Sequence, residues 1–139
     1  MKAVSFANDV LDDTLNNGAS GTFTVGSNTY TLPLRLKFLS TVSTDATAGT
    51  EWPTSGGYTA GGVTLAGKVA TAAANKSKAN TADITVSNAP AGTWADNEVV
   101  DSSGTPKRMV FKGAPSLAKT VNAGDTCTVA AGSLVANDA

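Results

Sequence analysis

The sequence predicts an all-β fold, an antiparallel β-sandwich or jelly-roll-like barrel with a short N-terminal α-helix. Residues 30–39 alternate apolar and polar side chains, the period of a strand with one buried face. Elsewhere short apolar runs recur about every 8 to 12 residues between clusters of Gly, Pro, Asn and Ser, which is typical of antiparallel folds. Because 139 residues is the size of one ordinary domain, we expect a single β-sandwich domain over residues 1–139.

Helical periodicity is confined to residues 1–18, a predicted N-terminal helix and arm. Its apolar positions recur at spacings of three and four: Val4, Ala7, Val10, Leu11, Thr14 and Leu15. We expect Ser5 to cap the start of the helix and Gly18 to end it in the left-handed conformation. Since the apolar side chains are one-sided, the helix is expected to pack on the rest of the domain.

The first predicted β structure is a hairpin. Residues 22–25 form one strand, Gly26-Ser27-Asn28 the turn, and residues 30–39 the other strand. The core face of this second strand is expected to carry Tyr30, Leu32, Leu34, Leu36 and Phe38. Pro33 lacks a backbone N–H, which predicts an edge position or a bulge.

A long loop and a series of short strands are predicted for the rest of the chain. Residues 40–62 show no sustained periodicity, so we expect a long surface loop, a kind of segment that is usually functional or mobile. Strands are expected at residues 63–65, 68–72, 81–86, 98–101, 107–112, 119–121 and 125–135, the last either continuous or broken at Gly132. Turns are expected at residues 75–78, 88–92, 102–106, 113–115 and 122–124. Residues 72–74 could instead form a helical turn.

Composition excludes several classes of function. Histidine is absent, so neither a Ser-His-Asp or Cys-His catalytic pair nor a His-ligated metal site can be built. The single cysteine, Cys127, excludes an intrachain disulfide, and we interpret it as a small buried residue rather than a nucleophile. With no recognisable ligand motif, we expect no cofactor and no metal.

Charge and hydropathy suggest neither a nucleic acid nor a membrane as a partner. The net charge is −1, and charged residues make up only 15% of the chain. No run of about 18 apolar residues occurs, and the first ten residues lack the apolar run of a signal peptide. We therefore expect a soluble protein made in a cytoplasm, with a neutral, Thr-rich surface suited to lying against other protein.

Three aromatic residues in or next to predicted loops are candidates for contacts: Trp52, Tyr58 and Trp94. Each ring could either cover one end of the core or contact a sugar or a neighbouring subunit. Trp52, next to Pro53 in the long loop, is the best contact candidate because a rigid ring near the surface contributes strongly to an interface.

Charged residues give a second set of candidates. Arg35 and Lys37 lie on the polar side of the alternating run, and Lys107, Arg108 and Lys112 form a small basic cluster. Such cations are usually solvated, but they could pair with acids on a neighbouring subunit. Among the carboxylates, Asp96 and Glu98 have the same parity on an extended chain, the one arrangement that could suit a glycosidase, although solvated acids are far commoner.

The C-terminal segment KTVNAGDTCTVAAGSLV, residues 119–135, resembles the ending of a family of small bacteriophage virion proteins, often labelled tail fibre or structural proteins. The similarity extends in order over most of the chain, through SFANDVLDDTL, GTE, SGGYT, SKANTADITV and the segment 94–101 before GTPKRMVFKG. The chain departs from the family at ADNEVVD, which is poorer in aromatic residues, and at LPLRLKFLS, which replaces an LYVALHT-like strand. Those positions are expected to face different neighbours here.

The resemblance implies a non-enzymatic part of a phage particle. A fibre shaft needs a length-generating repeat, and heptads, collagen triplets and repeated β units are all missing. We therefore expect a capsid cement or decoration protein on the virion surface, made in the bacterial host cytoplasm. Its expected partners are the major capsid protein and further copies of itself, as a dimer or trimer.

Two other functions stay open from the sequence. The first is a tail-fibre or baseplate module that binds a host-surface glycan through Trp52, Tyr58 or Trp94. The second is a carboxylate-based hydrolase that uses Asp96 or Glu98.

Overall fold

The computed structural model describes residues 3–44, 46–109 and 117–137, and within them the chain is mostly β. In these described residues one helix, α1 (Val4–Thr14), precedes twelve short strands, all paired antiparallel. The strands are β1 (Thr22–Val25), β2 (Asn28–Thr31), β3 (Arg35–Leu39), β4 (Val63–Thr64), β5 (Ser77–Ala79), β6 (Ile84–Val86), β7 (Gly92–Trp94), β8 (Asp96–Val100), β9 (Arg108–Met109), β10 (Lys119–Val121), β11 (Cys127–Val129) and β12 (Val135–Asn137).

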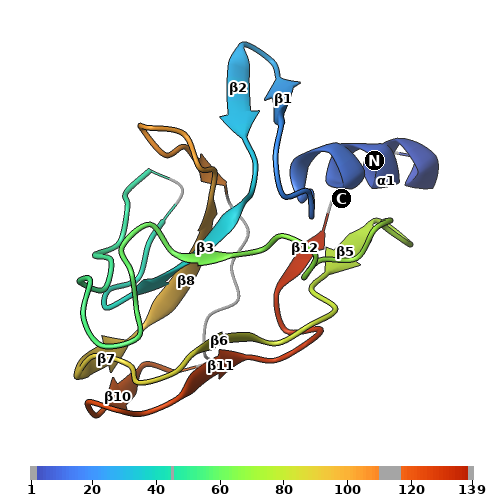
Figure 1. The fold of residues 1–139 in the computed structure, drawn as a ribbon. Coiled ribbons are helices and arrows are strands. Elements are labelled where there is room, and N and C mark those ends of the chain that lie inside the picture. The colour runs from blue at the N-terminus through green and yellow to red at the C-terminus, as the bar shows by residue number, and fades with distance from the viewer. Residues whose placement is uncertain (1–2, 45, 110–116, 138–139) are drawn as a thin grey trace.

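The strands form several small sheets (Figure 1). In the described residues, one sheet has the order β4-β3-β8-β9, and four two-stranded sheets pair β1 with β2, β5 with β12, β6 with β11 and β7 with β10. The β1–β2 hairpin stands away from the four-stranded sheet, and α1 lies beside β5 and β12. The prediction of a mostly β chain with one short helix is confirmed, and none of these sheets closes into a barrel.

Helix α1 forms where its periodicity predicts, but its ends differ from the prediction. Ala7, Leu11 and Leu15 are buried and face the core. The helix starts after Ala3, two residues earlier than a cap at Ser5 would allow, and no side chain caps it. It ends at Leu15 rather than Gly18, with the Leu15 N–H donating to the Leu11 carbonyl.

Two polar side chains of α1 fasten it to the turn that precedes β5. Asn8 Oδ1 accepts a hydrogen bond from the Lys76 N–H at 2.9 Å, and Asp12 Oδ1 accepts one from the Ala73 N–H at 2.7 Å. The Lys78 ammonium, whose side chain is only 2% exposed, lies 3.2 Å from the same Asp12 oxygen. Lys78 is therefore not a solvated cation, because its buried side chain pairs with a half-exposed acid of the helix.

The β1–β2 hairpin forms where it is predicted, but its turn has only the two residues Gly26 and Ser27, because Asn28 already belongs to β2. Gly26, the first turn residue, has a φ of 61°, which suits a II′ turn that needs glycine there. Phe23 and Tyr30 stack across the strands with ring centroids 5.2 Å apart. On the exposed side the Thr24 and Thr29 hydroxyls lie 3.3 Å apart, and a similar pair, Thr85 and Thr128 at 3.1 Å, joins β6 to β11.

The alternating run splits into two strands, β2 and β3, around Pro33. In and before β3 the predicted core residues Leu34, Leu36 and Phe38 are all buried, so the period-two prediction is confirmed there. Strand β3 lies between β4 and β8, so it is a central strand and not an edge. Pro33 is accommodated because it lies in the bend between the two strands, where no ladder hydrogen bond is needed.

The described residues of the segment 40–62 form no regular strand and most of them are exposed, so the predicted surface loop is confirmed, although Trp52 and Tyr58 anchor it to the core. The Trp52 N–H donates to the Phe38 carbonyl at 2.9 Å, and Ser55 and Tyr58 exchange backbone hydrogen bonds. Gly57 lies so close to the 87–88 backbone that a Cβ there would overlap the Ser87 carbonyl oxygen. The glycines of this segment therefore allow a close approach that a helix or strand pattern does not reveal.

The later strands agree with the sequence in part. Five strands, β4, β6, β8, β9 and β10, fall in or overlap predicted strands. Residues 110–112 of the predicted 107–112 strand and the predicted turn 113–115 lie outside the described residues. The predicted strand 125–135 is divided into β11 and the start of β12 by a turn at 131–132. In the predicted strand 68–72 the structure has only a single bridge, between Val69 and Asn80, and residues 72–74 form no helical turn. Strands β5 and β7 are not predicted, and each begins inside a predicted turn, 75–78 for β5 and 88–92 for β7.

Strand β5 escapes a sequence-based prediction because its turn is shorter than expected. Asn75 and Lys76 both have positive φ, 50° and 61°, which makes a two-residue turn of the I′ kind and lets β5 begin at Ser77. Lysine is rare at positive φ, and the hydrogen bond from the Lys76 N–H to Asn8 Oδ1 stabilises this conformation. The helix and this hairpin thus stabilise each other.

We predict that Asp12→Ala lowers the free energy of unfolding by about 2–3 kcal/mol, because it leaves the Lys78 ammonium buried without its acid and the Ala73 N–H without its acceptor. The estimate stays below that for a fully buried pair because the Asp12 side chain is 36% exposed. Urea denaturation measures the effect. The exposed Asp9→Ala is the matched control, with a change within about 0.5 kcal/mol. Lys78→Met should recover part of the loss in the Asp12→Ala background, and a double variant as unstable as the single one would contradict this role.

Candidate interaction sites

The three aromatic contact candidates lie in the core around Phe38. Their ring centroids are 5.1 Å (Trp52), 6.0 Å (Tyr58) and 5.3 Å (Trp94) from that of Phe38. Trp52 is 4% exposed, Tyr58 1% and Trp94 7%. The interpretation of Trp52 as a ring presented at the surface is therefore wrong, and the alternative that these rings cover the core is the one observed. The reason is that residues 40–62 fold back over β3.

The polar atoms of both indoles are satisfied inside the protein. Trp52 Nε1 donates to the Thr93 carbonyl at 2.9 Å, and Trp94 Nε1 donates to Asn97 Oδ1 at 2.9 Å. The Trp52 hydrogen bond joins the 40–62 segment to β7, and the Trp94 hydrogen bond joins β7 to β8.

Tyr58 joins β3 to an acid on the loop. Its hydroxyl accepts a hydrogen bond from the Phe38 N–H at 3.2 Å and donates one to Glu51 Oε1 at 2.8 Å. The same Glu51 oxygen accepts a hydrogen bond from the Gly61 N–H at 2.6 Å. Burial raises the pKa of the Tyr58 phenol well above its ordinary value, and the neighbouring Glu51 adds to the shift, which outweighs the opposing effect of the Phe38 N–H.

The four basic candidates that the structure describes are engaged with groups of the same chain. On the outer side of the four-stranded sheet, Lys37 Nζ lies 3.4 Å from Glu51 Oε2, and Arg108 Nε lies 2.5 Å from Glu98 Oε1. The Arg108 guanidinium also donates to the Thr44 carbonyl, which holds the loop over the sheet. These contacts make the cations structural parts of the sheet.

Arg35 and Lys107 contact the segment that follows β8. Arg35 Nε donates to Ser102 Oγ at 3.1 Å. Lys107 Nζ lies 3.9 Å from Asp101 Oδ2 and 5.9 Å from the centroid of the Tyr30 ring. Both side chains are half-buried, so part of each stays available at the surface.

The carboxylates considered for hydrolysis are buried and receive several hydrogen bonds. Asp96 Oδ2 accepts from the Ser43 N–H and hydroxyl at 2.9 and 3.0 Å, and Asp96 Oδ1 accepts from the Asn97 N–H at 2.8 Å. Glu98 is paired with Arg108. Both acids stabilise the loops around β8 through these contacts.

Asp101 is a third buried acid of the same kind. Burial alone would raise the pKa of its carboxyl, but the N–H groups of Lys107 and Thr31 and the Ser103 hydroxyl outweigh it and lower the pKa below its ordinary value. The carboxylate therefore stabilises the connection between β8 and β9 as an anion.

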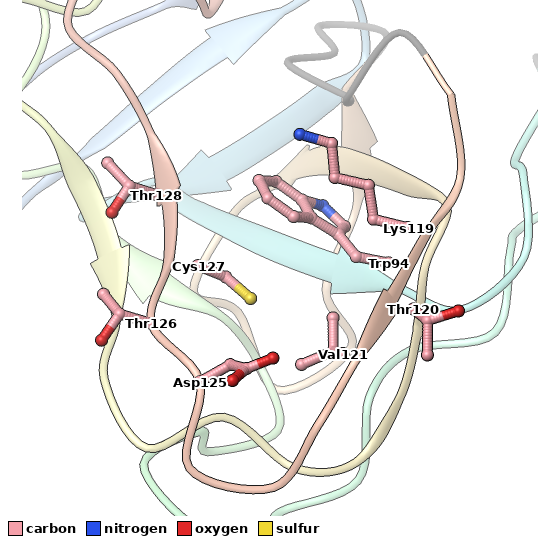
Figure 2. A pocket seen from close by; sticks show the side chains of 8 residues that line it. All are labelled: Trp94, Lys119, Thr120, Val121, Asp125, Thr126, Cys127 and Thr128. Carbon is pink, nitrogen blue, oxygen red and sulfur yellow. The ribbon is translucent and has the colours of Figure 1, made fainter.

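The structure contains a pocket that the sequence did not predict, between β10 and β11 (Figure 2). Its volume is about 390 Å³, and we call it the β10–β11 mouth. It is lined by Trp94, Lys119, Thr120, Val121, Asp125, Thr126, Cys127 and Thr128. Seven of the eight residues lie in the C-terminal segment 119–135, but no spacing in that segment indicates a pocket.

A second feature missed by the sequence is an exposed apolar surface on α1 and the hairpin. Phe6 is 57% exposed and Val25 is 43% exposed. A groove of about 250 Å³ between the two elements is lined by Val10, Thr14, Thr24, Val25 and Gly26. We call Phe6 together with these groove residues the helix–hairpin face. The one available signal was that Phe6 lies off the buried stripe of Ala7, Leu11 and Leu15.

No protein family, curated protein or solved structure matches the chain in the comparisons with known proteins. Over the described ranges, no three acid or cysteine side chains gather in a way that could hold a metal ion. In the same residues, no helix has the length and apolar character that crossing a lipid bilayer requires.

Tyr58 makes the fold sensitive to alkali. The folded protein keeps this phenol protonated, whereas in the unfolded chain it ionises near its ordinary pKa of 10.0, so its contribution to stability is complete below pH 10 and declines above it. We predict a free energy of unfolding that falls between pH 9 and pH 11, and a smaller fall in Tyr58→Phe. In a Tyr30→Phe background the remaining tyrosine should show no ionisation absorbance near pH 10 until the protein unfolds, and a normal titration there would contradict the buried hydrogen bonds.

Cys127 is predicted to react slowly with alkylating reagents. Burial raises the pKa of its thiol, Asp125 raises it further and Lys119 opposes them, so little of the reactive thiolate is present at pH 7.5. Iodoacetamide should therefore label the folded protein much more slowly than the chain unfolded in guanidinium. Asp125→Asn should speed the reaction and Lys119→Ala should slow it. Equal rates in folded and unfolded protein would show that the thiol is not buried.

Proposed function

We propose that this chain is a non-enzymatic bacteriophage virion structural protein, a capsid cement or decoration protein that binds the assembled major-capsid lattice and stabilises the head. The observation that carries the proposal is the helix–hairpin face, where Phe6 and Val25 expose large apolar side chains beside a groove. Exposed apolar surface of this kind marks sites of protein contact. The family resemblance of the sequence supplies the partner.

The energetics of such a contact suit a cement protein. Burying one Phe side chain on binding contributes about 1.5–3 kcal/mol. A protein that binds only the assembled shell stabilises it by mass action, and many copies on one particle add their contributions. The helix–hairpin face, with one aromatic ring, a few aliphatic side chains and threonines, is therefore large enough for each copy to contribute to the stability of the shell.

The state of the carboxylates supports a role without catalysis. Asp96 and Glu98 are buried and hold backbone and guanidinium donors, so acting as an acid–base pair would require both to give up contacts that order the loops. This arrangement fits structural acids better than a hydrolase.

The glycan-binding alternative loses its main support. Stacking on a sugar needs an exposed ring face, and Trp52, Tyr58 and Trp94 are all buried against Phe38. The tail-fibre or baseplate function is therefore the weaker proposal.

Further parts of the proposal concern architecture and location. We infer that the small sheets around the single hydrophobic core act together as a β-sandwich body, with α1 and the hairpin at one end. On the capsid surface, copies would associate as dimers or trimers after synthesis in the host cytoplasm. Since α1 carries the exposed Asp9, the capsid region that meets it is expected to be basic as well as apolar.

The test is binding to heads assembled from the major capsid protein that the same genome encodes. We predict that the wild-type chain co-sediments with these heads and raises the temperature at which they release DNA or fall apart. Phe6→Ser should weaken binding about ten- to a hundredfold, the fold-change that corresponds to losing one buried Phe.

Val42→Ser is the matched control, because Val42 is also exposed but lies outside the helix–hairpin face. It should bind as the wild type does. Wild-type protein that neither binds nor stabilises the heads would overturn the proposal, and equal binding by Phe6→Ser would reject this face as the contact.

A further inference from the structure

The β10–β11 mouth is an opening into the hydrophobic core. Figure 2 shows Trp94, Lys119, Val121, Asp125 and Cys127 turned toward the space between the strands, while the threonines at 120, 126 and 128 turn away from it. Trp94, Val121 and Cys127 belong to the core and form an apolar floor. The exposed Lys119 and Asp125 form a charged rim above the floor.

Hydrogen bonds at the turn between the two strands hold the mouth open. The Gly124 N–H donates to the Ala89 carbonyl at 2.9 Å, and the Ala89 N–H donates to the Asp125 carbonyl at 2.8 Å. The Asn122 N–H donates to Asp125 Oδ2 at 2.8 Å. Because the turn is tied to the 87–91 segment, β10 follows β7 and β11 follows β6, and the mouth exists before any partner binds.

The rim has a direction, since its cation and its anion lie on different sides of the opening. Lys119 comes from the start of β10, and Asp125 comes from the turn before β11. A segment that carries an acid on the Lys119 side, a base on the Asp125 side and an apolar side chain between them would match both the rim and the floor.

The surroundings of the mouth favour a protein segment over a sugar or a small free ligand. The Trp94 indole is only 7% exposed, so little of its ring is available for stacking on a sugar. On both sides the exposed threonines of β10 and β11 continue the surface, which suits contact with an extended chain. The chemistry is thus that of an apolar knob on a polypeptide.

The position of the mouth matters for a cement protein. In Figure 1 the β7–β10 pair and the α1–hairpin pair lie at opposite ends of the molecule. A subunit that strengthens a lattice must contact two neighbours, and two separated contact sites on one rigid body meet that need.

We propose that the β10–β11 mouth is a second capsid-binding site, which receives an apolar side chain of a major-capsid segment flanked by an acid and a base. The inference rests on the proposed function. The helix–hairpin face binds one capsid subunit and the mouth binds a neighbouring one, so the protein bridges them.

The first experiment uses Lys119→Glu, which reverses one side of the charged rim at an exposed position. The variant should still bind heads through the helix–hairpin face, with an association rate roughly tenfold lower at low salt and a weaker salt dependence than the wild type. At equal occupancy it should lose most of the thermal stabilisation of the head. Lys68→Glu, which does not line the mouth, is the matched control and should behave as the wild type does.

The second experiment uses thiols as reporters of occupancy. Alkylation of Cys127 by iodoacetamide at pH 9 should be slower in head-bound protein than in free protein, because an inserted side chain covers the floor. A Thr126→Cys substitution in a Cys127→Ala background places a thiol on the exposed surface beside the mouth, where the extended chain that carries the inserted side chain should protect it from labelling. This second reporter serves if the buried thiol reacts too slowly to compare.

The outcomes separate the two proposals. Wild-type protein that does not bind the heads removes the proposed function, and the bridging inference with it. Binding and stabilisation by the wild type, combined with unchanged thiol labelling and full stabilisation by Lys119→Glu, would overturn the inference alone. A mouth that serves a free small ligand would give this second result.

Discussion

The core of this protein is built from few large side chains, because Phe, Trp and Tyr together make up only 6% of the sequence. The strands alone supply mainly Leu, Ile and Val, and most strands are three to five residues long. The 40–62 segment therefore contributes Trp52 and Tyr58, which pack on Phe38 together with Trp94 from β7. Without this folded-back segment the inner face of β3 would lack its cover, and the exposure of Phe38 would cost burial energy.

The outer side of the central sheet is held by polar groups in place of apolar packing. Every residue of β8 is buried, although Asp96, Asn97 and Glu98 are polar. Burying such groups is costly unless their hydrogen bonds are satisfied, and here the donors come from loop backbone and from Arg108. The consequence is that loops distant in sequence are fixed over β8 by directional contacts, which specify one arrangement.

The parts of this fold that the sequence predicts are those with a local cause. The stripe of Ala7, Leu11 and Leu15 predicts the helix, the glycine turn predicts the β1–β2 hairpin, and the alternation of Leu34, Leu36 and Phe38 predicts the buried face of β3. Each depends on periodicity or on turn chemistry within a few residues.

The parts that could not be predicted depend on contacts across the chain. Trp52 and Tyr58 are buried because of Phe38, 14 and 20 positions away in sequence, and Lys78 is buried because Asp12 lies 66 positions before it. The candidate cations Lys37 and Arg108 were recognised as residues, but their acids Glu51 and Glu98 were not recognisable as partners. The mouth and the helix–hairpin face arise from the meeting of elements, so no single segment encodes them.

The paired threonines on the strand surfaces, Thr24 with Thr29 and Thr85 with Thr128, join neighbouring strands through neutral hydroxyl groups. Such cross-strand pairs carry no net charge for dissolved ions to screen, so their contribution to stability does not depend on the salt concentration.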